Sequence, residues 1–468
     1  MLQWGALLAA GPALARNASA MPRRSSAMLA MELELVTLTE TSAVITWYTG
    51  DPTAPDALGR PAPVPADTEL LVGTSPLNLS PVVHHSHGTA YHYAEVHGLE
   101  PGRAYFYLAR SAGQPAVPAL ASFGNPAGTS TSAPGVFGFT TPLPPPGRHL
   151  LTLALTNDLH IGEGTSGIAA NGLPPGVTQL PGRPPYAEVM AASMVQDARR
   201  RGAHLLLVAG DVTSEAAPVD LTRARELLDG FGDLGKDYLV CRGNHDRPHT
   251  GPAYSHCTPT DRGNDCFADG FADGKTWFRK DHHGLRILGL DTYDKAGNGG
   301  DNGVLGPEQW AWLQAQLAEE PERPTLVLGH HPVTVESSVT GVPPVTFTLE
   351  QQQGQQLEAL YAKTPGVFLH HAGHTHRNKR TLSPVARGTV FQEVAATKEY
   401  PGGFTLLRIH ERGYALNFYK TRGEQAREWS ARTRQEYGGL YPSYTLGTLL
   451  DRNSLVQRDF SGLRPHGH

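Results

Sequence analysis

The chain is poor in three features, and each absence excludes a class of protein. It has only three cysteines in 468 residues, which excludes a small scaffold built from disulfides. It has no excess of positive charge, because 39 Lys and Arg stand against 44 Asp and Glu, so nucleic-acid binding through a basic surface is not expected. No apolar run approaches the ~20 residues of a membrane span, so no transmembrane segment is expected.

The three cysteines occupy two kinds of position. Cys241 ends the apolar run YLVC, where a buried free thiol is the simplest interpretation. Cys257 and Cys266 lie close together in the polar insert HCTPTDRGNDC and could pair in an oxidising compartment. The sequence alone leaves that pairing open.

The first 28 residues are ambiguous. Residues 2–15 (LQWGALLAAGPALA) resemble the apolar region of a signal peptide, and small-x-small sites follow. The basic segment that should precede such a region is missing, so a spurious extension before Met21 is the alternative. We favour a secreted, periplasmic or cell-surface protein over a cytoplasmic one.

The length of the chain and the change in its residue pattern near residue 150 predict two domains. With 52 Gly and 38 Pro, the chain is rich in turns and long loops. Residues 29–142 contain short runs of β-branched and aromatic residues between Gly, Pro and Ser clusters, with Trp47 as a candidate core residue, which predicts an all-β domain. The Pro-rich stretch TPLPPPGRH then predicts a stiff linker, and residues 422–468 are expected to form a polar tail.

Residues 150–421 alternate between apolar runs and helical patterns, which predicts an α/β domain. Four stretches have helical periodicity: YAEVMAASMVQDARRRG, LTRARELLDGF, PEQWAWLQAQLAEE and LEQQQGQQLEALYAK. Three later runs, GTVFQEVAA, FTLLRIHE and YALNFYKT, are expected to be closing antiparallel strands.

Polar motifs follow the apolar runs of this second domain where each run ends. The motifs are NDLH, GDVTS, RGNHD, HHP and GHTH. Open α/β sheets place their sites at the carboxyl ends of their strands, so these side chains are expected to meet there. They are Asp158, His160, Asp211, Asn244, His245, Asp246, His330, His374 and His376.

The side chains in these motifs form a mixed set of nitrogen and oxygen ligands. Asp158 and His160, like His374 and His376, are two residues apart, which puts both side chains on one side of an extended chain. Carboxylates, imidazoles and an amide suit Mn, Fe or Zn. Any one motif could be turn chemistry or a hydrogen-bonded core histidine. Five in succession, each closing an apolar run, favour a metal site.

The series DxH, GD, GNHD, VxxH and GHxH resembles the calcineurin-like metallophosphoesterase family over residues 150–421. The segments GLDTYD and GVLGPEQWAWLQAQL also resemble the middle region of that family. The resemblance implies a four-layer α/β/β/α sandwich with two divalent metal ions at the strand ends. It assigns one ion to Asp158, His160, Asp211 and His376, and the other to Asp211, Asn244, His330 and His374. In the VxxH motif the histidine stands three residues after the valine, so Val327 indicates His330, and not His331, as the ligand.

The resemblance also implies a chemistry. A hydroxide bridging the two ions would attack phosphorus in line, and His245, oriented by Asp246, would protonate the leaving alkoxide. The alternative for His245 is that it only supports Asn244.

A β domain before such an α/β domain resembles the purple acid phosphatases and implies a fibronectin type III-like sandwich. Those enzymes carry an iron-binding Tyr three residues after the shared Asp. Here that position is Ser214, so a ferric tyrosinate site is not expected. The motifs more closely resemble bacterial metallophosphoesterases, including class III cyclic nucleotide phosphodiesterases.

The expected function is hydrolysis of small-molecule phosphomonoesters or phosphodiesters. A 3′,5′-cyclic nucleotide phosphodiesterase is the alternative within the enzyme class, and a scaffold that binds a partner or a surface is the non-enzymatic one. The presence of all seven ligand positions disfavours the scaffold. Inserts at 167–185, 247–283 and 332–347 are expected to rim the pocket. The oligomeric state is not predicted.

Two arginines and four histidines near the motifs receive no definite role in the site from the sequence. Arg242 and Arg247 flank the GNHD motif, and each could contact phosphate or be solvated at the surface. Four histidines without a motif partner are expected to be structural: His282, His283, His370 and His371.

Overall fold

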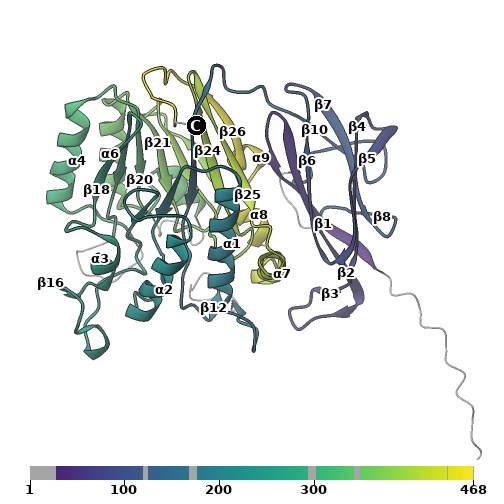
Figure 1. Ribbon diagram of the computed structural model, residues 1–468, viewed down its shortest axis with the longest axis horizontal. Helices are drawn as coiled ribbons and strands as arrows, with labels where there is room; N and C mark the ends of the chain where they lie inside the picture. Colours follow the sequence, from purple (N-terminus) through teal and green to yellow (C-terminus); the bar gives the residue numbers. More distant parts are fainter. Residues whose placement is uncertain are drawn as a thin grey trace, which may run out of the picture.

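The computed structural model describes residues 28–119, 125–167, 176–293, 302–341, 348–439 and 441–466. The signal-like stretch 2–15 lies outside these residues, as do parts of the inserts 167–185 and 332–347. Figure 1 shows a domain of strands, in purple and blue, beside a larger domain in which helices cover strands.

The N-terminal domain consists of two antiparallel sheets. One sheet contains β1 (Leu29–Leu38), β2 (Ser42–Pro55), β3 (Pro61–Pro63) and β6 (Tyr91–His97). The other contains β4 (Ala66–Ser75), β5 (Asn78–Thr89), β7 (Ala104–Ser111), β8 (Gln114–Pro115), β9 (Thr129–Ser130) and β10 (Phe137–Thr140).

Alternation of buried and more exposed residues in β6 and β7 places one face of each strand in the sandwich core. Trp47, which the sequence predicts to be a core residue, is 3% exposed, and its indole N–H donates to Ser111 Oγ at 2.9 Å. The sequence did not predict β5, because NLSPVVHHSHGT is polar and this edge strand is largely exposed.

The larger domain contains two six-stranded sheets. The first has the order β15 (Tyr238–Cys241), β14 (Leu205–Ala209), β11 (His149–Thr156), β24 (Gly403–His410), β25 (Gly413–Lys420) and β26 (Asn453–Gln457). The second has the order β18 (Phe278–His282), β19 (Leu285–Gly289), β20 (Thr325–Leu328), β21 (Val367–Ala372), β23 (Val390–Glu393) and β22 (Lys379–Leu382).

The prediction of three closing antiparallel strands is correct for β24 and β25 and correct only in part for β23. Strand β24 is antiparallel to both β11 and β25. Strand β23 instead runs parallel to β21 and is antiparallel only to β22, which the sequence did not reveal. The hairpin partner of β23 therefore precedes it in the chain.

Helices cover the outer faces of the two sheets, which gives the α/β/β/α arrangement expected from the sequence. The first sheet carries α1 (Tyr186–Arg200) and α2 (Pro218–Asp229), and the second carries α4 (Pro307–Glu319) and α6 (Gln351–Ala362). Met190, Met194 and Ala198 form the buried face of α1. One apolar core contains residues of both sheets, and a second lies between the second sheet and its helices.

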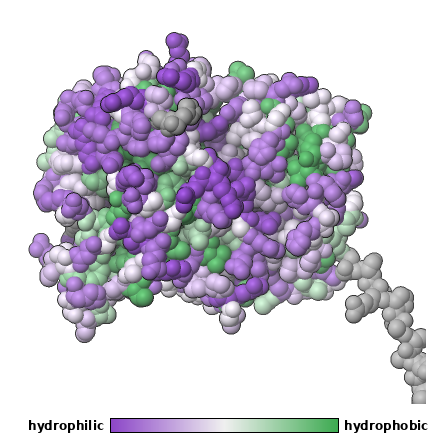
Figure 2. Space-filling view, in the orientation of Figure 1, coloured by the Kyte–Doolittle hydropathy of each residue, from purple (hydrophilic) through white to green (hydrophobic). Residues whose placement is uncertain are grey.

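Several shorter strands and helices lie outside the two large sheets and the helices that cover them. They are β12 (Thr165–Ser166), β13 (Val177–Thr178), η1 (Pro252–Tyr254), β16 (Pro259–Thr260), β17 (Gly263–Asn264), α3 (Cys266–Phe271), α5 (Val335–Thr340) and η2 (Glu436–Gly439). Among the described residues, no helix is both long enough and apolar enough to cross a membrane. The face in Figure 2 is largely hydrophilic, with separate small hydrophobic areas.

The prediction of a polar tail at 422–468 is wrong. This segment contains α7 (Glu424–Thr433), α8 (Tyr441–Thr445), α9 (Leu449–Arg452) and β26, which completes the first sheet. Arg452 is 1% exposed and donates to the carbonyl oxygens of Leu35 and Val36 in β1. Part of the charge of this segment is therefore buried in contacts with the N-terminal domain, as at Arg434, which pairs with Glu32 and Glu34.

Candidate metal centre

The candidate ligands lie where five strands of the two sheets end. Asp158 and His160 follow β11, Asp211 follows β14, and Asn244 follows β15 in the first sheet. His330 follows β20, and His374 and His376 follow β21 in the second sheet. All seven are at most 9% exposed. The structure thus brings the predicted ligands together, while metal binding by them stays a prediction.

The side chains form two groups that meet at Asp211. The groups are Asp158, His160 and His376, and Asp211, His330 and His374; in each, candidate ligand atoms lie within 4.8 Å of one another. His160 Nε2 and His330 Nε2 are 3.4 and 3.1 Å from Asp211 Oδ2. His376 Nε2 is 3.2 Å from Asp158 Oδ1, and Asn244 Oδ1 is 3.0 Å from His330 Nε2.

The backbone at the site has an unusual conformation. Five candidate ligands have left-handed φ angles: Asp158 (50°), His160 (47°), Asp211 (51°), His374 (67°) and His376 (53°). Such angles are uncommon outside glycine and cost on the order of 1 kcal/mol each, so the surrounding structure must enforce them. Five in one place indicate loops shaped to aim side chains at a common point.

Glycines in the motifs allow these loops to pass close to the carboxylates. A Cβ on Gly243 would lie 2.0 Å from Asp211 Oδ1, and one on Gly373 would lie 2.6 Å from Asp158 Oδ2. The first residues of the motifs GNHD and GHTH are therefore required by packing against the ligands.

Hydrogen bonds fix two of the histidines. His376 Nδ1 bonds to Glu399 Oε1 at 2.7 Å, and His330 Nδ1 bonds to the carbonyl oxygen of Ala209 at 2.8 Å. Carboxylate and carbonyl partners of this kind set the tautomer and orientation of metal-binding histidines. Glu399 was not among the predicted site residues, because it lies in the irregular stretch between β23 and β24, where no motif marks it.

The charge and bonding of the site suit a cation. Burial alone would raise the pKa of the Asp158 carboxyl, but attraction to His376 and the close approach of His160 and His376 hold it well below its usual range. Asp158 Oδ1 lies 3.2 Å from His376 Nε2 and 3.7 Å from His160 Nε2, and among the described residues neither Asp158 Oδ1 nor His160 Nε2 has a partner at hydrogen-bond geometry. Buried polar atoms are rarely left in that state, so the residues present fit a divalent ion bound by nitrogen and oxygen.

His245 reaches the same centre from β15. Its side chain is half-buried, its ring centroid is 4.6 Å from that of His160, and its backbone N–H donates to Asp211 Oδ1 at 2.9 Å. Its Nδ1 donates to the carbonyl oxygen of Ser214 at 2.7 Å. Burial lowers the pKa of the His245 ring, against the attraction of Asp211.

Asp246 does not orient His245 as predicted. In the contacts of the described chain, its carboxylate accepts from the backbone N–H groups of Val212, Thr213 and Gly243 at 3.0–3.1 Å and from the hydroxyl of Thr213 at 2.8 Å. The Asp246 side chain is thus buried against the Asp211 loop, while the adjacent His245 lies beside His160. Asp246 therefore holds the loop that carries Asp211, and the Ser214 carbonyl holds His245.

Neither of the two arginines beside the GNHD motif is simply a solvated surface residue, because both are ion-paired. Arg242 is 1% exposed and pairs with Asp265 at 2.5 Å, with Asp291 3.7 Å away, so it anchors α3. Arg247 is half-buried and pairs with Glu215 at 3.2 Å.

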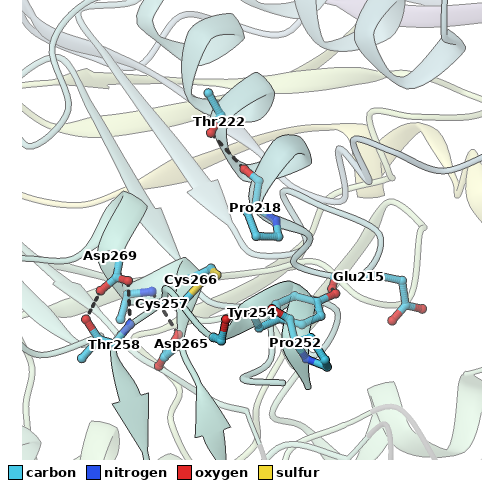
Figure 3. Close-up of a disulfide and its surroundings, with 12 residues drawn as sticks. Glu215, Pro218, Thr222, Pro252, Tyr254, Cys257, Thr258, Asp265, Cys266 and Asp269 are labelled. Atoms are coloured by element: carbon cyan, nitrogen blue, oxygen red, sulfur yellow. Dashed lines mark hydrogen bonds between the residues drawn. A yellow bond between two sulfur atoms is a disulfide. The ribbon is translucent and has the colours of Figure 1, made fainter. Parts of the chain in front are cut away.

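The insert 247–283 is tied by a disulfide. Cys257 and Cys266 are joined, as the sequence allowed, and Cys241 is buried and free. Figure 3 shows the disulfide beside Asp269, whose carboxylate accepts from the backbone and hydroxyl of Thr258. In the same view Tyr254 donates to the carbonyl of Glu215 at 3.2 Å. The insert thus packs against the loop that follows Asp211.

The chain is similar over part of its length to known proteins. Residues 151–378 match the family model described as calcineurin-like phosphoesterase. A probable cyclic nucleotide phosphodiesterase of Synechococcus sp. is 26% identical over 40% of this chain and 63% of its own length. The glycerophosphodiester phosphodiesterase GpdQ of Enterobacter lignolyticus is 26% identical over 42% of this chain and 63% of its own length. The chain therefore spans less than two thirds of these relatives.

Two solved structures are also similar in part. A dimetal phosphatase from Danio rerio superposes with a TM-score of 0.44 and 13% identity, over 59% of this chain and 98% of its own. The purple acid phosphatase PPD1 from yellow lupin superposes with a TM-score of 0.41 and 16% identity, over 92% of this chain and 75% of its own. Residues 151–378 therefore form a calcineurin-like phosphoesterase domain.

Proposed function

We propose that the chain is a metal-dependent phosphoric ester hydrolase with two divalent ions at the candidate metal centre. The observation that carries this proposal is the convergence of seven buried ligand residues, among which Asp211 Oδ2 lies 3.4 Å from His160 of one group and 3.1 Å from His330 of the other. Asp158, His160 and His376 would hold one ion, and Asn244, His330 and His374 the other. When bound, such ions supply positive charge to a phosphate group and lower the pKa of a water molecule.

The residues of the chain provide orientation and a proton. The Ser214 carbonyl accepts from Nδ1 of His245, so Nε2 is the atom that can exchange a proton with the leaving alkoxide. Glu399 keeps Nε2 of His376 directed at Asp158. The ligands are buried, and His245 is more exposed than they are.

Phosphodiesters are the substrate class that we favour. Both curated relatives are named as phosphodiesterases, and Arg242 is already paired with Asp265, so it is not available to bind a doubly charged phosphomonoester. A 3′,5′-cyclic nucleotide is the second candidate, because the Synechococcus relative bears that name. Retention of all seven ligand positions argues against a scaffold without activity.

A metal-reconstituted assay tests the proposal. Protein loaded with Mn²⁺ or Zn²⁺ should hydrolyse bis(p-nitrophenyl) phosphate faster than p-nitrophenyl phosphate, with cyclic AMP and glycerophosphodiesters compared in parallel. Asn244→Ala should lose at least about 100-fold in kcat/KM. His245→Ala should lose about 10²-fold or more on esters with poor leaving groups and much less on p-nitrophenyl esters.

The control is His97→Ala, which removes an exposed histidine of the N-terminal domain and should leave the rates unchanged. Metal-loaded wild type that is inactive on every ester would overturn the hydrolase assignment. Full activity of His245→Ala on a poor leaving group would instead remove only the proton-donor role.

A further inference from the structure

A second histidine cluster lies near the start of strand β11, at the opposite end of that strand from the candidate metal centre. His282 ends β18, His283 begins the turn into β19, and His466 lies in the C-terminal segment. The backbone N–H of His466 donates to the carbonyl of Leu150 at the start of β11. The eight residues of β11 span about 25 Å, and Asp158 lies beyond their far end.

We propose that His282, His283 and His466 bind one transition-metal ion of the zinc type, which ties the C-terminal segment to the β18–β19 turn. This site goes beyond the proposed hydrolase activity and shares no residue with its metal centre. Candidate ligand nitrogens of the three rings all lie within 4.8 Å of one another.

The spacing of the nitrogens fits one ion. His466 Nδ1 and His283 Nε2 are 3.2 Å apart. Two nitrogens bound to one tetrahedral zinc at about 2.05 Å are separated by about 3.3 Å, so these atoms already have the separation of two zinc ligands. His282 Nε2 is buried and makes no hydrogen bond with any of the residues that the structure describes, so it is the third candidate ligand atom.

The backbone of the turn is adapted to hold His283 in place. His283 has φ 52° and Gly284 has φ 96°, and they connect the paired residues His282 and Leu285. Such a two-residue turn favours Asn or Gly at its first position. Histidine at this position carries a conformational cost, which is typical of residues kept for a binding role.

The C-terminal segment is held against this turn by its own contacts. The backbone N–H of Arg464 donates to the carbonyl of His283 at 2.9 Å, and Leu463 is 5% exposed. The ring of His204 stacks on that of His466 at a centroid distance of 3.9 Å and an angle of 14°. Figure 1 shows the chain ending beside the sheet that contains β24. His466 is thus presented in one orientation.

The chemistry of the cluster selects the kind of ion. Burial and the neighbouring histidines lower the pKa of His282 to about 4, and burial and His283 lower that of His466. Neutral imidazole is the form that binds metals. The group offers imidazole nitrogens alone, which suits Zn²⁺, Ni²⁺ or Cu²⁺ rather than Mg²⁺ or Ca²⁺, and it leaves a fourth position for water.

Metal counting tests this site. Full-length protein without a histidine tag is equilibrated with Zn²⁺, exchanged into metal-free buffer, and analysed by elemental mass spectrometry. The His283→Ala/His466→Ala variant should hold one Zn²⁺ per chain fewer than wild type, whatever number the phosphoesterase centre retains. Its hydrolase activity should match that of wild type, which also shows that the variant folds.

The matched control is His149→Ala/His410→Ala, a neighbouring pair of rings 5.2 Å apart at the same edge of the sheet. It should keep the metal content of wild type. In hydrogen exchange, Zn²⁺ should slow the amide of Arg464 at least 10-fold in wild type and in this control, but not in the His283/His466 variant. Equal Zn²⁺ content in wild type and that variant would overturn the site and leave the hydrolase proposal standing.

Discussion

Glu34→Gln should weaken the interface between the two domains. Glu34 in β1 is 2% exposed, and its carboxylate accepts hydrogen bonds at 2.6 Å from both Tyr400 Oη and Lys420 Nζ. Arg434 Nε donates to the same carboxylate at 3.2 Å. Because all three partners belong to the larger domain or its C-terminal segment, this one side chain ties the β-sandwich to both.

The magnitude follows from the pKa of Glu34. Burial alone would raise it, but Lys420 and Arg434 lower it from 4.5 to about 2. One pKa unit corresponds to about 1.4 kcal/mol, so the ionised carboxylate contributes about 3 kcal/mol relative to its protonated form. Burial lowers the pKa of Lys420 in spite of this bond. The figure is therefore the cost of removing the carboxylate from its partners, and not the net worth of the pair.

The sign of the pH dependence is fixed by the direction of that shift. A carboxyl with a lowered pKa stabilises the fold above its unfolded pKa of 4.5, and this contribution is lost as the pH falls toward 2. In urea denaturation, Glu34→Gln should lower the free energy of unfolding by about 3 kcal/mol at pH 7. The difference between variant and wild type should shrink to about 1 kcal/mol at pH 3.

The control is Glu69→Gln, which removes the partner of Arg110 within the N-terminal sandwich. That pair is less buried, so less than about 1 kcal/mol should be lost at pH 7. A Glu34→Gln variant within 1 kcal/mol of wild type at pH 7, or a difference that does not change between pH 7 and pH 3, would refute the reasoning.

Three further changes test the site and the fold. Gly243→Ala places a Cβ 2.0 Å from Asp211 Oδ1, and the displaced carboxylate should lower kcat about 100-fold in the phosphodiester assay while circular dichroism stays unchanged. Glu399→Gln weakens the bond that orients His376, and chelator competition should show metal affinity about 10–100-fold lower. Deletion of 422–468 removes β26 from the first sheet and should leave little soluble, protease-resistant protein; a stable truncated chain would contradict the packing described.

Much of the fold and the candidate ligand set could be predicted because local patterns encode them. Apolar runs such as HLLTLALT are buried strands, and the polar motif after each run marks the strand end where Asp158 or Asp211 lies. Parallel strands carry such motifs to one edge of a sheet, so order along the chain was enough to predict that these side chains meet.

The remaining features depend on contacts between distant segments. Glu399 bonds to His376 across 23 residues, and Asp246 turns away from the adjacent His245 to hold the loop of Asp211. No periodicity in the sequence reports either arrangement. In the sequence the C-terminal segment resembles a tail because it is rich in charged and polar residues. A charged residue such as Arg452 is buried only where acceptors meet it, here the carbonyl oxygens of Leu35, Leu446 and Gly447.

The interface and the metal centre are joined by one short stretch of chain, residues 397–400. Lys398 donates its backbone N–H to the carbonyl of Asp158, Glu399 bonds to His376, and Tyr400 bonds to Glu34. Tyr441 of the C-terminal segment also donates to Glu399, at 2.5 Å. The sandwich and the C-terminal segment therefore both support the side chain that orients a candidate ligand. Since metal-binding histidines depend on such partners, precise docking of the N-terminal domain and the final residues supports the candidate metal centre as well as the stability of the chain.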